Sequence, residues 1–192
     1  MTIMVGGDLK MPSMRLNGQI AVITGGGRGL GRAWALALGQ AGAETVLVSR
    51  TLSELQEVAD TICAGGGVAS SIECDVTDTR QVGATIGQLD RIDILVNGAG
   101  INIPEPFLKV TEEHFDQTMS LNVKAVFVVS QTVVRRMRAT GSGGAIINIS
   151  SQMGHVGAPN RIVYCTSKHA MEGMAKFMKR GNHFIKRHEC GF

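Results

Sequence analysis

Residues 20–38, which read IAVITGGGRGLGRAWALAL, decide the fold of this chain. An apolar run (20–23) passes into a glycine-rich turn (24–31), and the turn passes into a segment rich in strong helix formers (32–38). This order predicts a buried strand, a tight turn and a helix. Glycines there allow a sharp turn and let a pyrophosphate approach the free N–H groups at the positive end of the helix. We therefore expect a dinucleotide to bind at this turn.

The spacing of these glycines differs from the usual dinucleotide fingerprint. Gly25, Gly29 and Gly31 give the pattern G-x-x-x-G-x-G, whereas the usual fingerprint is G-x-G-x-x-G. A glycine-rich stretch of this kind is also compatible with a plain loop, so the rest of the chain has to decide between the two interpretations.

Short apolar runs alternate with helical segments along the rest of the chain. Further strands are expected at 45–48, 68–74, 92–96 and 145–149, and helices at 52–64, 78–89, from about 112, at 122–138 and around 164–168. Thr51-x-x-Glu54 reads as a capping box at the start of the second helix. Strands that alternate with helices require right-handed crossovers and a parallel sheet covered on both faces. We expect an α/β, doubly wound, Rossmann-like fold whose ligands lie beyond the carboxyl ends of the strands.

Length and composition fit one globular domain. The chain has 192 residues, of which 44% are hydrophobic and 18% charged, enough for a single sizeable core. No apolar run approaches the roughly 20 residues that span a bilayer. Residues 1–14 lack the apolar core of a signal peptide and suggest a flexible leader. We expect a cytoplasmic protein without a membrane partner.

Positive charge is concentrated near the end of the sequence. Residues 176–192 contain five Lys and Arg against one Glu, a net charge of +4, whereas the whole chain carries +3, so the first 175 residues sum to −1. A basic run can indicate nucleic-acid binding, but this one has few aromatic residues and no recognisable binding module. We interpret 179–192 as an irregular, solvated tail and expect no nucleic-acid partner.

The cysteines show neither a C-x-x-C pair nor a regular spacing, which predicts free thiols in a reducing compartment. They are Cys63, Cys74, Cys165 and Cys190. His183 and His188 lie near Cys190 in the sequence, but they lack a fourth ligand. We therefore expect no metal site.

Tyr164 and Lys168 set a phenol and an ammonium four residues apart, and a second hydroxyl, Ser151, precedes the tyrosine by thirteen residues. In a helix, positions 164 and 168 stack on one face about one turn apart and look into the same site. A nearby cation favours the phenolate, which makes the tyrosine a usable general acid or base near neutral pH. Taken alone, such a pair is more often a solvated pair on a helix surface.

Five motifs follow one another along the chain: T-G-x-x-x-G-x-G at 24–31, N-G-A-G at 97–100 after a buried strand, Asn122, Ser151 and Y-x-x-x-K at 164–168. In their order and in the Ser-to-Tyr spacing they resemble the short-chain dehydrogenase/reductase family. The likeness covers residues 15–178 and implies a dinucleotide-binding oxidoreductase domain over this range.

The resemblance implies a cofactor site built from five segments of the chain. Its residues are Thr24, Gly25, Arg28, Gly29, Leu30, Gly31, Ser49, Arg50, Asp75, Val76, Asn97, Ala99, Gly100, Tyr164 and Lys168. Arg28 and Arg50 flank the expected adenosine ribose, where an NAD-binding protein would carry an acidic residue. A pair of guanidinium groups favours the 2′-phosphate of NADP. NAD remains an alternative, and both arginines are also compatible with ordinary surface charges.

Catalytic roles also follow from the resemblance. Tyr164 would deliver or remove a proton at the substrate oxygen, and Lys168 would assist it and hold the nicotinamide ribose. Ser151 would orient the substrate oxygen, while Asn122 would help to hold a water molecule of the proton relay. The hydride itself belongs to the cofactor. Ser150 is the rival of Ser151, and only the thirteen-residue spacing selects Ser151.

Two features depart from the family pattern. Gly98 stands where the family has the second Asn of Asn-Asn-Ala-Gly, which we expect to loosen one structural contact without removing cofactor binding. The likeness stops near Phe177, and the family's last strands, Pro-Gly segment and substrate loop find no counterpart. We therefore expect a C-terminally truncated member whose sheet lacks those strands and exposes an edge.

Two functions compete on this basis. The first is an oxidoreductase that transfers a hydride between NADP(H) and a small carbonyl or secondary alcohol substrate. The second is a catalytically impaired fragment that at most binds a dinucleotide. The fold alone does not identify the substrate. By resemblance, keto-acyl thioesters and sugar or polyol carbonyls are both compatible substrates. A homo-oligomer, paired through the helices that bear Asn122 and Tyr164, is a further expectation from the resemblance.

Overall fold

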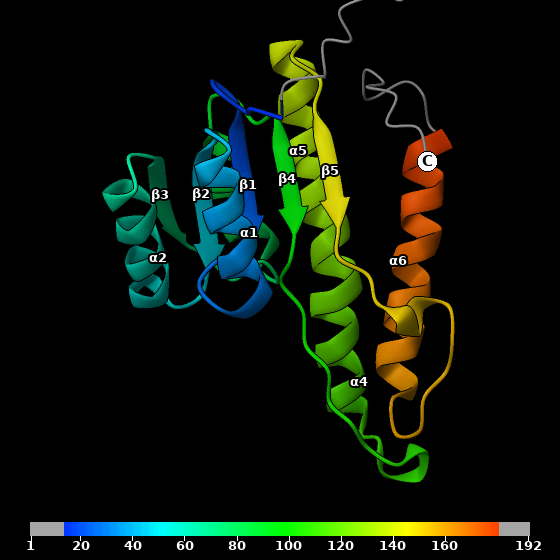
Figure 1. Ribbon diagram of the computed structural model, residues 1–192. Helices are drawn as coiled ribbons and strands as arrows, with labels where there is room; N and C mark the ends of the chain where they lie inside the picture. The colour runs from blue at the N-terminus through cyan, green and yellow to red at the C-terminus, as the bar shows by residue number, and fades with distance from the viewer. Residues whose placement is uncertain (1–13, 181–192) are drawn as a thin grey trace, which may run out of the picture.

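The computed structural model describes residues 14–180, which form five strands and the helices between them (Figure 1). The strands are β1 (Ile20–Thr24), β2 (Glu44–Ser49), β3 (Val68–Glu73), β4 (Ile94–Asn97) and β5 (Ala145–Asn148). The helices are α1 (Gly29–Gln40), α2 (Leu52–Ala64), α3 (Thr79–Ala84), α4 (Glu112–Met119), α5 (Val126–Thr140) and α6 (Ile162–Arg180).

All five strands run parallel, in the order β3-β2-β1-β4-β5. The chain proceeds from β1 toward β3 on one side and then returns to β4 and β5 on the other. The reversal between β1 and β4 leaves a crevice at the carboxyl ends of these strands, where doubly wound folds bind their ligands. The predicted fold class is confirmed.

Apolar side chains fill both faces of the sheet. One cluster packs β1 and β2 against α1 and α2, with Ile23, Leu47 and Leu55 fully buried. The other packs the opposite face against α3 and α5 and includes Leu95 and Val133. Strands covered on both faces read as continuous apolar runs, and this is why the sequence located β1, β2 and β4.

The helix predicted over 78–89 is in fact two short pieces. α3 ends at Ala84, and a 3₁₀ turn follows at Ile86–Gln88. Between them Thr85 has φ −114° and ψ −81°, outside the helical range, and its hydroxyl donates to the Gln81 carbonyl at 2.7 Å. A side chain that bonds back to the preceding turn competes with the regular helix. The predicted start was correct, because Asp78 caps α3 by accepting from the N–H groups of Arg80 and Gln81.

The two helices predicted from about 112 and over 122–138 form one continuous helical stretch. A π-helical turn, Ser120–Ala125, joins α4 to α5 without a loop. Such turns hold one extra residue and are frequent at functional sites. Asn122 lies within the turn, and its contacts are described below with the site.

The predicted capping box at the start of α2 is wrong. α2 begins at Leu52, as expected, but the Thr51 side chain makes no capping hydrogen bond. The backbone N–H of Thr51, which Glu54 was expected to satisfy, donates instead to the Ser49 hydroxyl at 3.2 Å.

Most of the predicted leader (1–14) and tail (179–192) lies outside the described residues. At the tail end, α6 remains helical through Arg180, two residues further than predicted. Cys63, Cys74 and Cys165 are free thiols, and Cys190 and the two tail histidines lie outside the described range. Residues 14–180 contain no helix long and apolar enough to cross a membrane, and no group of three potential metal ligands.

Candidate active site

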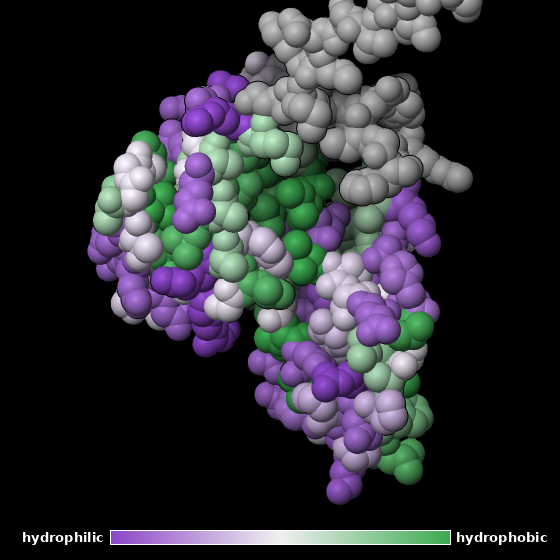
Figure 2. Space-filling view, in the orientation of Figure 1, coloured by the Kyte–Doolittle hydropathy of each residue, from purple (hydrophilic) through white to green (hydrophobic). Residues whose placement is uncertain are grey.

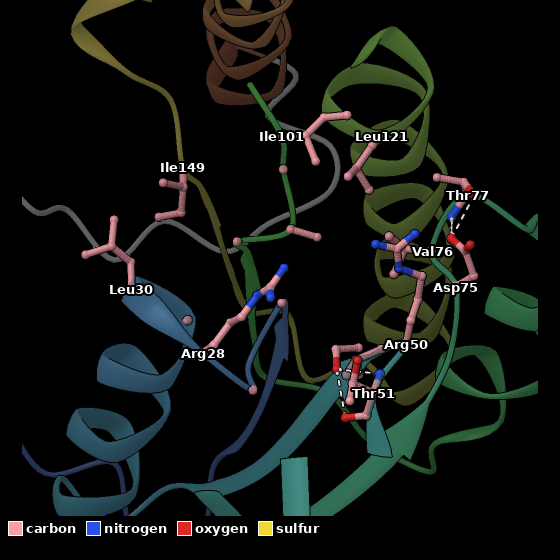
Figure 3. Close-up of a pocket in the computed structure, with 18 of the residues that line it drawn as sticks. Arg28, Leu30, Arg50, Thr51, Asp75, Val76, Thr77, Ile101, Leu121 and Ile149 are labelled. Carbon is pink, nitrogen blue, oxygen red and sulfur yellow. Dashed lines mark hydrogen bonds between the residues drawn. The ribbon is translucent and has the colours of Figure 1, made fainter. Parts of the chain in front are cut away.

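A cavity of about 660 Å³ opens at the carboxyl ends of β1, β2 and β4 (Figure 3). Its walls come from the glycine turn before α1, from the segments that follow β2, β3 and β4, and from the first turns of α6. The volume lies in the ordinary range for small-molecule sites. The cavity occupies the switch point of the sheet, as the sequence predicted.

Most of the predicted cofactor residues line this cavity. They are Gly25, Arg28, Leu30, Gly31, Ser49, Arg50, Asp75, Val76, Ala99, Gly100, Tyr164 and Lys168. Thr24, Gly29 and Asn97 do not line it. The Thr24 hydroxyl accepts from the N–H groups of Gly98 and Ala99, and the Asn97 amide donates to Ser130 and Asn148. Thr24 therefore fixes the backbone of the segment after β4, and Asn97 joins β4 to β5 and α5 beneath the cavity.

The glycine turn fits the close approach of a pyrophosphate. Gly25 has φ +72°, and a Cβ added there would lie 3.0 Å from the backbone nitrogen of Ala99. A Cβ on Gly31 would collide with the Gly25 carbonyl, whereas one on Gly29 would meet nothing within 4 Å. The turn thus packs against the segment after β4 on its inner side and is open on its outer side. No side chain caps the start of α1, so the first N–H groups of this helix are available to an anion.

Two arginines reach into the same cavity from different elements (Figure 3). Arg28 comes from the glycine turn, and Arg50 follows β2. The Arg28 side chain is 82% exposed, and one of its terminal nitrogens lies 3.9 Å from a Glu54 carboxylate oxygen. The site therefore offers guanidinium groups that a phosphate could reach.

Asp75 and Val76 lie at the same end of the cavity, beside Leu121 (Figure 3). One oxygen of Asp75 accepts from the Thr77 N–H at 2.9 Å and from the Thr77 hydroxyl at 2.7 Å, which fixes the turn after β3. Val76 is buried and, with Leu121, supplies apolar surface. This end of the cavity fits a flat heterocycle with a polar edge.

Tyr164 and Lys168 face the cavity together from the first turns of α6. The Lys168 ammonium lies 5.6 Å from the centroid of the tyrosine ring and donates to the Ile149 carbonyl at 2.7 Å. Lys168 is only 6% exposed, and burial lowers the pKa of its ammonium below the ordinary 10.5. The segment after β5 thereby fixes the position of the cation relative to the phenol.

Asn122 is buried behind the cavity, and its side chain joins three segments. The amide nitrogen donates to the Ile101 carbonyl at 2.8 Å and to the Ser167 hydroxyl at 3.1 Å, and the amide oxygen accepts from the Ile101 N–H at 2.9 Å. Ser167 in turn donates to the Tyr164 carbonyl. Asn122 is thus placed to position the loop after β4 and the helix of the Tyr–Lys pair, and its predicted role toward a water molecule stays a prediction.

Ser150, and not Ser151, is among the residues that line the cavity. The Ser151 hydroxyl accepts from the Met153 N–H at 3.2 Å and so caps a 3₁₀ turn, Gln152–Gly154. The Ser150 hydroxyl is buried and has no hydrogen-bond partner among the described residues. The choice of Ser151 by spacing stays a prediction, and Ser150 remains the alternative because it lines the cavity.

Sequence reasoning missed Trp34, which packs over Gly98 and lines the cavity. A Cβ on Gly98 would lie 2.8 Å from the Trp34 ring and 2.8 Å from the Thr24 carbonyl oxygen. The indole of Trp34 therefore fills the space that a side chain at position 98, such as the asparagine of the family pattern, would need. The signal was present as two unusual residues, a tryptophan among the small and aliphatic residues of α1 and a glycine at position 98.

Glu54 was also missed as a cavity residue, because its position suggested a capping role alone. Apolar wall residues such as Ile101, Leu121 and Ile149 carry no local signal that separates them from the core.

A parallel sheet with a glycine turn and a Tyr–Lys pair at one cavity is characteristic of a dinucleotide-dependent oxidoreductase. A family model described as short chain dehydrogenase matches residues 19–183. The chain is 39% identical over 173 residues to L-xylulose reductase of Mesocricetus auratus, covering 89% of this chain and 69% of that protein. It is 36% identical over 177 residues to D-erythrulose reductase of Gallus gallus, with coverages of 91% and 70%.

Among solved structures, a gluconate 5-dehydrogenase of Burkholderia cenocepacia in complex with NADP and tartrate superposes with a TM-score of 0.84 at 34% identity. The alignment covers 91% of this chain and 70% of that one. The chain belongs to the short-chain dehydrogenase/reductase family, whose members are NAD(P)-dependent oxidoreductases. The family match favours an oxidoreductase over the alternative of an impaired fragment.

Proposed function

We propose that this protein transfers a hydride between NADP(H) and a small carbonyl or secondary alcohol, with Tyr164 as the general acid or base. One observation carries the proposal. The Tyr164 and Lys168 side chains line the same cavity as the glycine turn and the two arginines. A proton-transfer group and a phosphate-binding end therefore share one site, which is the arrangement that hydride transfer from a dinucleotide requires.

The cofactor end supports NADP as the dinucleotide. The open glycine turn would hold the pyrophosphate, and Arg28 and Arg50 would hold a 2′-phosphate by charge-assisted hydrogen bonds. The structurally similar gluconate 5-dehydrogenase was solved with NADP bound. When bound, the cofactor supplies or accepts the hydride, and the protein supplies binding and orientation.

The reacting end is built from α6 and the segment after β5. Tyr164 would hold the proton that passes to the substrate oxygen in reduction and receive it in oxidation. Lys168, fixed by the Ile149 carbonyl, places a cation beside the phenol and would hold the nicotinamide ribose. Ser151, or its rival Ser150, would orient the substrate oxygen. Asn122 acts as a positioning residue through Ile101 and Ser167.

Small polyhydroxylated carbonyls form the substrate class that the relatives favour. Two relatives are named as reductases of L-xylulose and D-erythrulose, and a structural relative as a gluconate 5-dehydrogenase. We therefore favour ketoses and sugar acids over keto-acyl thioesters. NADPH oxidation followed at 340 nm with L-xylulose, D-erythrulose and an acetoacetyl thioester separates the classes, and turnover of the thioester alone would overturn this choice. A cytoplasmic location and pairing through the helices of Asn122 and Tyr164 stay predictions.

The acid/base role is tested by Tyr164→Phe, which removes one oxygen and keeps the ring. We expect turnover to fall by about 10²-fold or more, because general acid–base catalysis contributes on that order. The NADPH Kd, measured by fluorescence titration, should change by less than about 3-fold. Thr166→Ala, an exposed hydroxyl deletion on the same helix, is the matched control and should keep full turnover. Persistent turnover in Tyr164→Phe would refute the role of the phenol.

A further inference from the structure

We propose that Glu54 sets the cofactor preference of this protein by competing with the 2′-phosphate of NADP for Arg28. The inference rests on the proposed dinucleotide function and adds a specificity-determining residue to it. It concerns the relative affinity of the cavity for adenosine ribose with and without a 2′-phosphate.

Glu54 lies across the glycine turn, at the cofactor end of the cavity. Its carboxylate is 3.9 Å from the Arg28 guanidinium, and its side chain is 37% exposed. A Cβ on Gly27 would lie 2.9 Å from the Glu54 Cβ and 3.2 Å from a carboxylate oxygen. The turn thus leaves room for this side chain only because residue 27 is a glycine.

The carboxylate is not used to begin α2, which is the ordinary role of an acidic residue at this position. The Thr51 N–H that a capping box would satisfy is already bonded to the Ser49 hydroxyl. Within residues 14–180, Arg28 is the one cation with which Glu54 pairs. The Glu54 carboxylate lines the cavity and is therefore placed to act on Arg28.

A ligand with a 2′-phosphate disturbs this pair, and a ligand without one does not. To bind the phosphate, Arg28 has to leave Glu54, and the remaining carboxylate then repels the new dianion at short range. Arg50 forms no ion pair with any described residue and offers its guanidinium at no such cost. Glu54 thus weakens binding of NADP selectively and keeps the affinities for NADP and NAD closer than two free arginines would.

The test is Glu54→Gln, which removes the charge and keeps the size of the side chain. Calorimetric titration of the full chain with adenosine 2′,5′-bisphosphate and with 5′-AMP isolates the 2′-phosphate from the rest of the cofactor. We expect the bisphosphate Kd to fall by about 5-fold at low salt, less at high salt, because a carboxylate is removed beside a phosphate. The 5′-AMP Kd should stay within about 2-fold of the wild type.

Glu57→Gln is the matched control, because it removes the same charge from the exposed side of α2, outside the cavity. Equal tightening of both nucleotides, or the same selective gain in Glu57→Gln, would reduce the effect to net charge and overturn the inference. An unchanged ratio of the two Kd values in Glu54→Gln would also overturn it.

A double variant tests whether Arg28 is the group for which Glu54 and the 2′-phosphate compete. In an Arg28→Gln background, Glu54→Gln should improve the bisphosphate Kd by a smaller factor than in the wild-type background, because the repulsion of the phosphate remains and only the competition for Arg28 is gone. An undiminished gain there would show that Arg28 is not the contested group. The proposed function fails separately, if the wild type binds neither NADPH nor NADH in fluorescence titration. If the wild type binds both NADPH and NADH, and Glu54→Gln leaves the ratio of the two nucleotide Kd values unchanged, only the role of Glu54 is refuted.

Discussion

The half of the sheet that carries the glycine turn and the half that carries the Tyr–Lys pair are built in different ways. β1 and β2 are buried along almost their whole length between the two core clusters. β5 lies at the edge of the sheet within the described residues, and Ile147 on it is 45% exposed. Figure 2 shows apolar surface gathered over this region, where Figure 1 places β4 and β5.

In the half of the sheet that carries the Tyr–Lys pair, hydrogen bonds between distant segments hold the site residues in position. Asn122 bonds to Ile101 and Ser167, and Lys168 bonds to the carbonyl of Ile149. In the first half, the backbone of the glycine turn and continuous apolar packing fix the site. Substitutions in the cofactor half should therefore act on folding and binding together. Those in the catalytic half should separate binding from turnover.

Gly31→Ala should have the largest effect, because it strikes the tightest contact of the cofactor half. The added Cβ would collide with the backbone of Gly25, which cannot move without opening the turn. We expect a loss of about 2–4 kcal/mol in the free energy of unfolding, measured in urea, and loss of detectable NADPH binding.

Gly83→Ala in α3 is the control for Gly31→Ala, since a Cβ there meets nothing within 4 Å. It should be neutral or slightly stabilising, because alanine favours a helix over glycine. If Gly31→Ala binds NADPH as the wild type does, the glycine turn is not the pyrophosphate site.

Asn122→Ala should have the next largest effect, and it tests how the catalytic half is positioned. It removes the side-chain partner of the half-buried N–H and carbonyl of Ile101, at a cost of about 1 kcal/mol of stability. Hydrogen exchange should show faster opening of the first turns of α6, and turnover should fall about 10-fold while the NADPH Kd changes by less than about 3-fold. Gln131→Ala, on the exposed side of α5, is the control and should change neither quantity. An unchanged exchange rate in α6 would contradict the positioning role.

The same contrast explains how much the sequence could predict. The alternation of strands and helices, the glycine turn and the common orientation of Tyr164 and Lys168 follow from local pattern, and the structure shows all three. The capping box failed because Ser49, on the preceding strand, satisfied the Thr51 N–H first.

Contacts between distant segments account for the rest. The π-helical turn at Asn122 joins two predicted helices, and its side chain bonds to a loop that is twenty-one residues away. The choice between Ser150 and Ser151 depends on how the chain turns after β5, not on the alternation of a strand that has already ended at Asn148. Trp34 and Gly98 are informative only as a pair, and they are sixty-four residues apart in the sequence.

Gly98→Asn restores the family residue and should nevertheless destabilise this chain, because Trp34 fills the space. We expect a loss of about 1–3 kcal/mol from overpacking. Trp34→Ala alone should also destabilise, by removing apolar contacts. The double variant should be more stable than the sum of the two losses predicts, by about 1 kcal/mol, in urea unfolding. Strict additivity would show that the indole and position 98 do not share the same space.

Lys168→Met should give the smallest effect on the free energy of unfolding, visible as a change with pH. Burial lowers the pKa of Lys168 in the folded protein below 10.5, so the unfolded chain holds the proton to higher pH than the folded one. Between the two pKa values the unfolded state binds more protons, and the free energy of unfolding rises with pH, by at most about 1.4 kcal/mol per pH unit for one group. The wild type should therefore gain stability relative to Lys168→Met as pH approaches 10.5 from below. Lys176→Met, an exposed lysine on the same helix, should run parallel to the wild type. A parallel curve for Lys168→Met as well would mean that its ammonium is not buried in solution, and the anchoring of the catalytic half at Ile149 would lose its support.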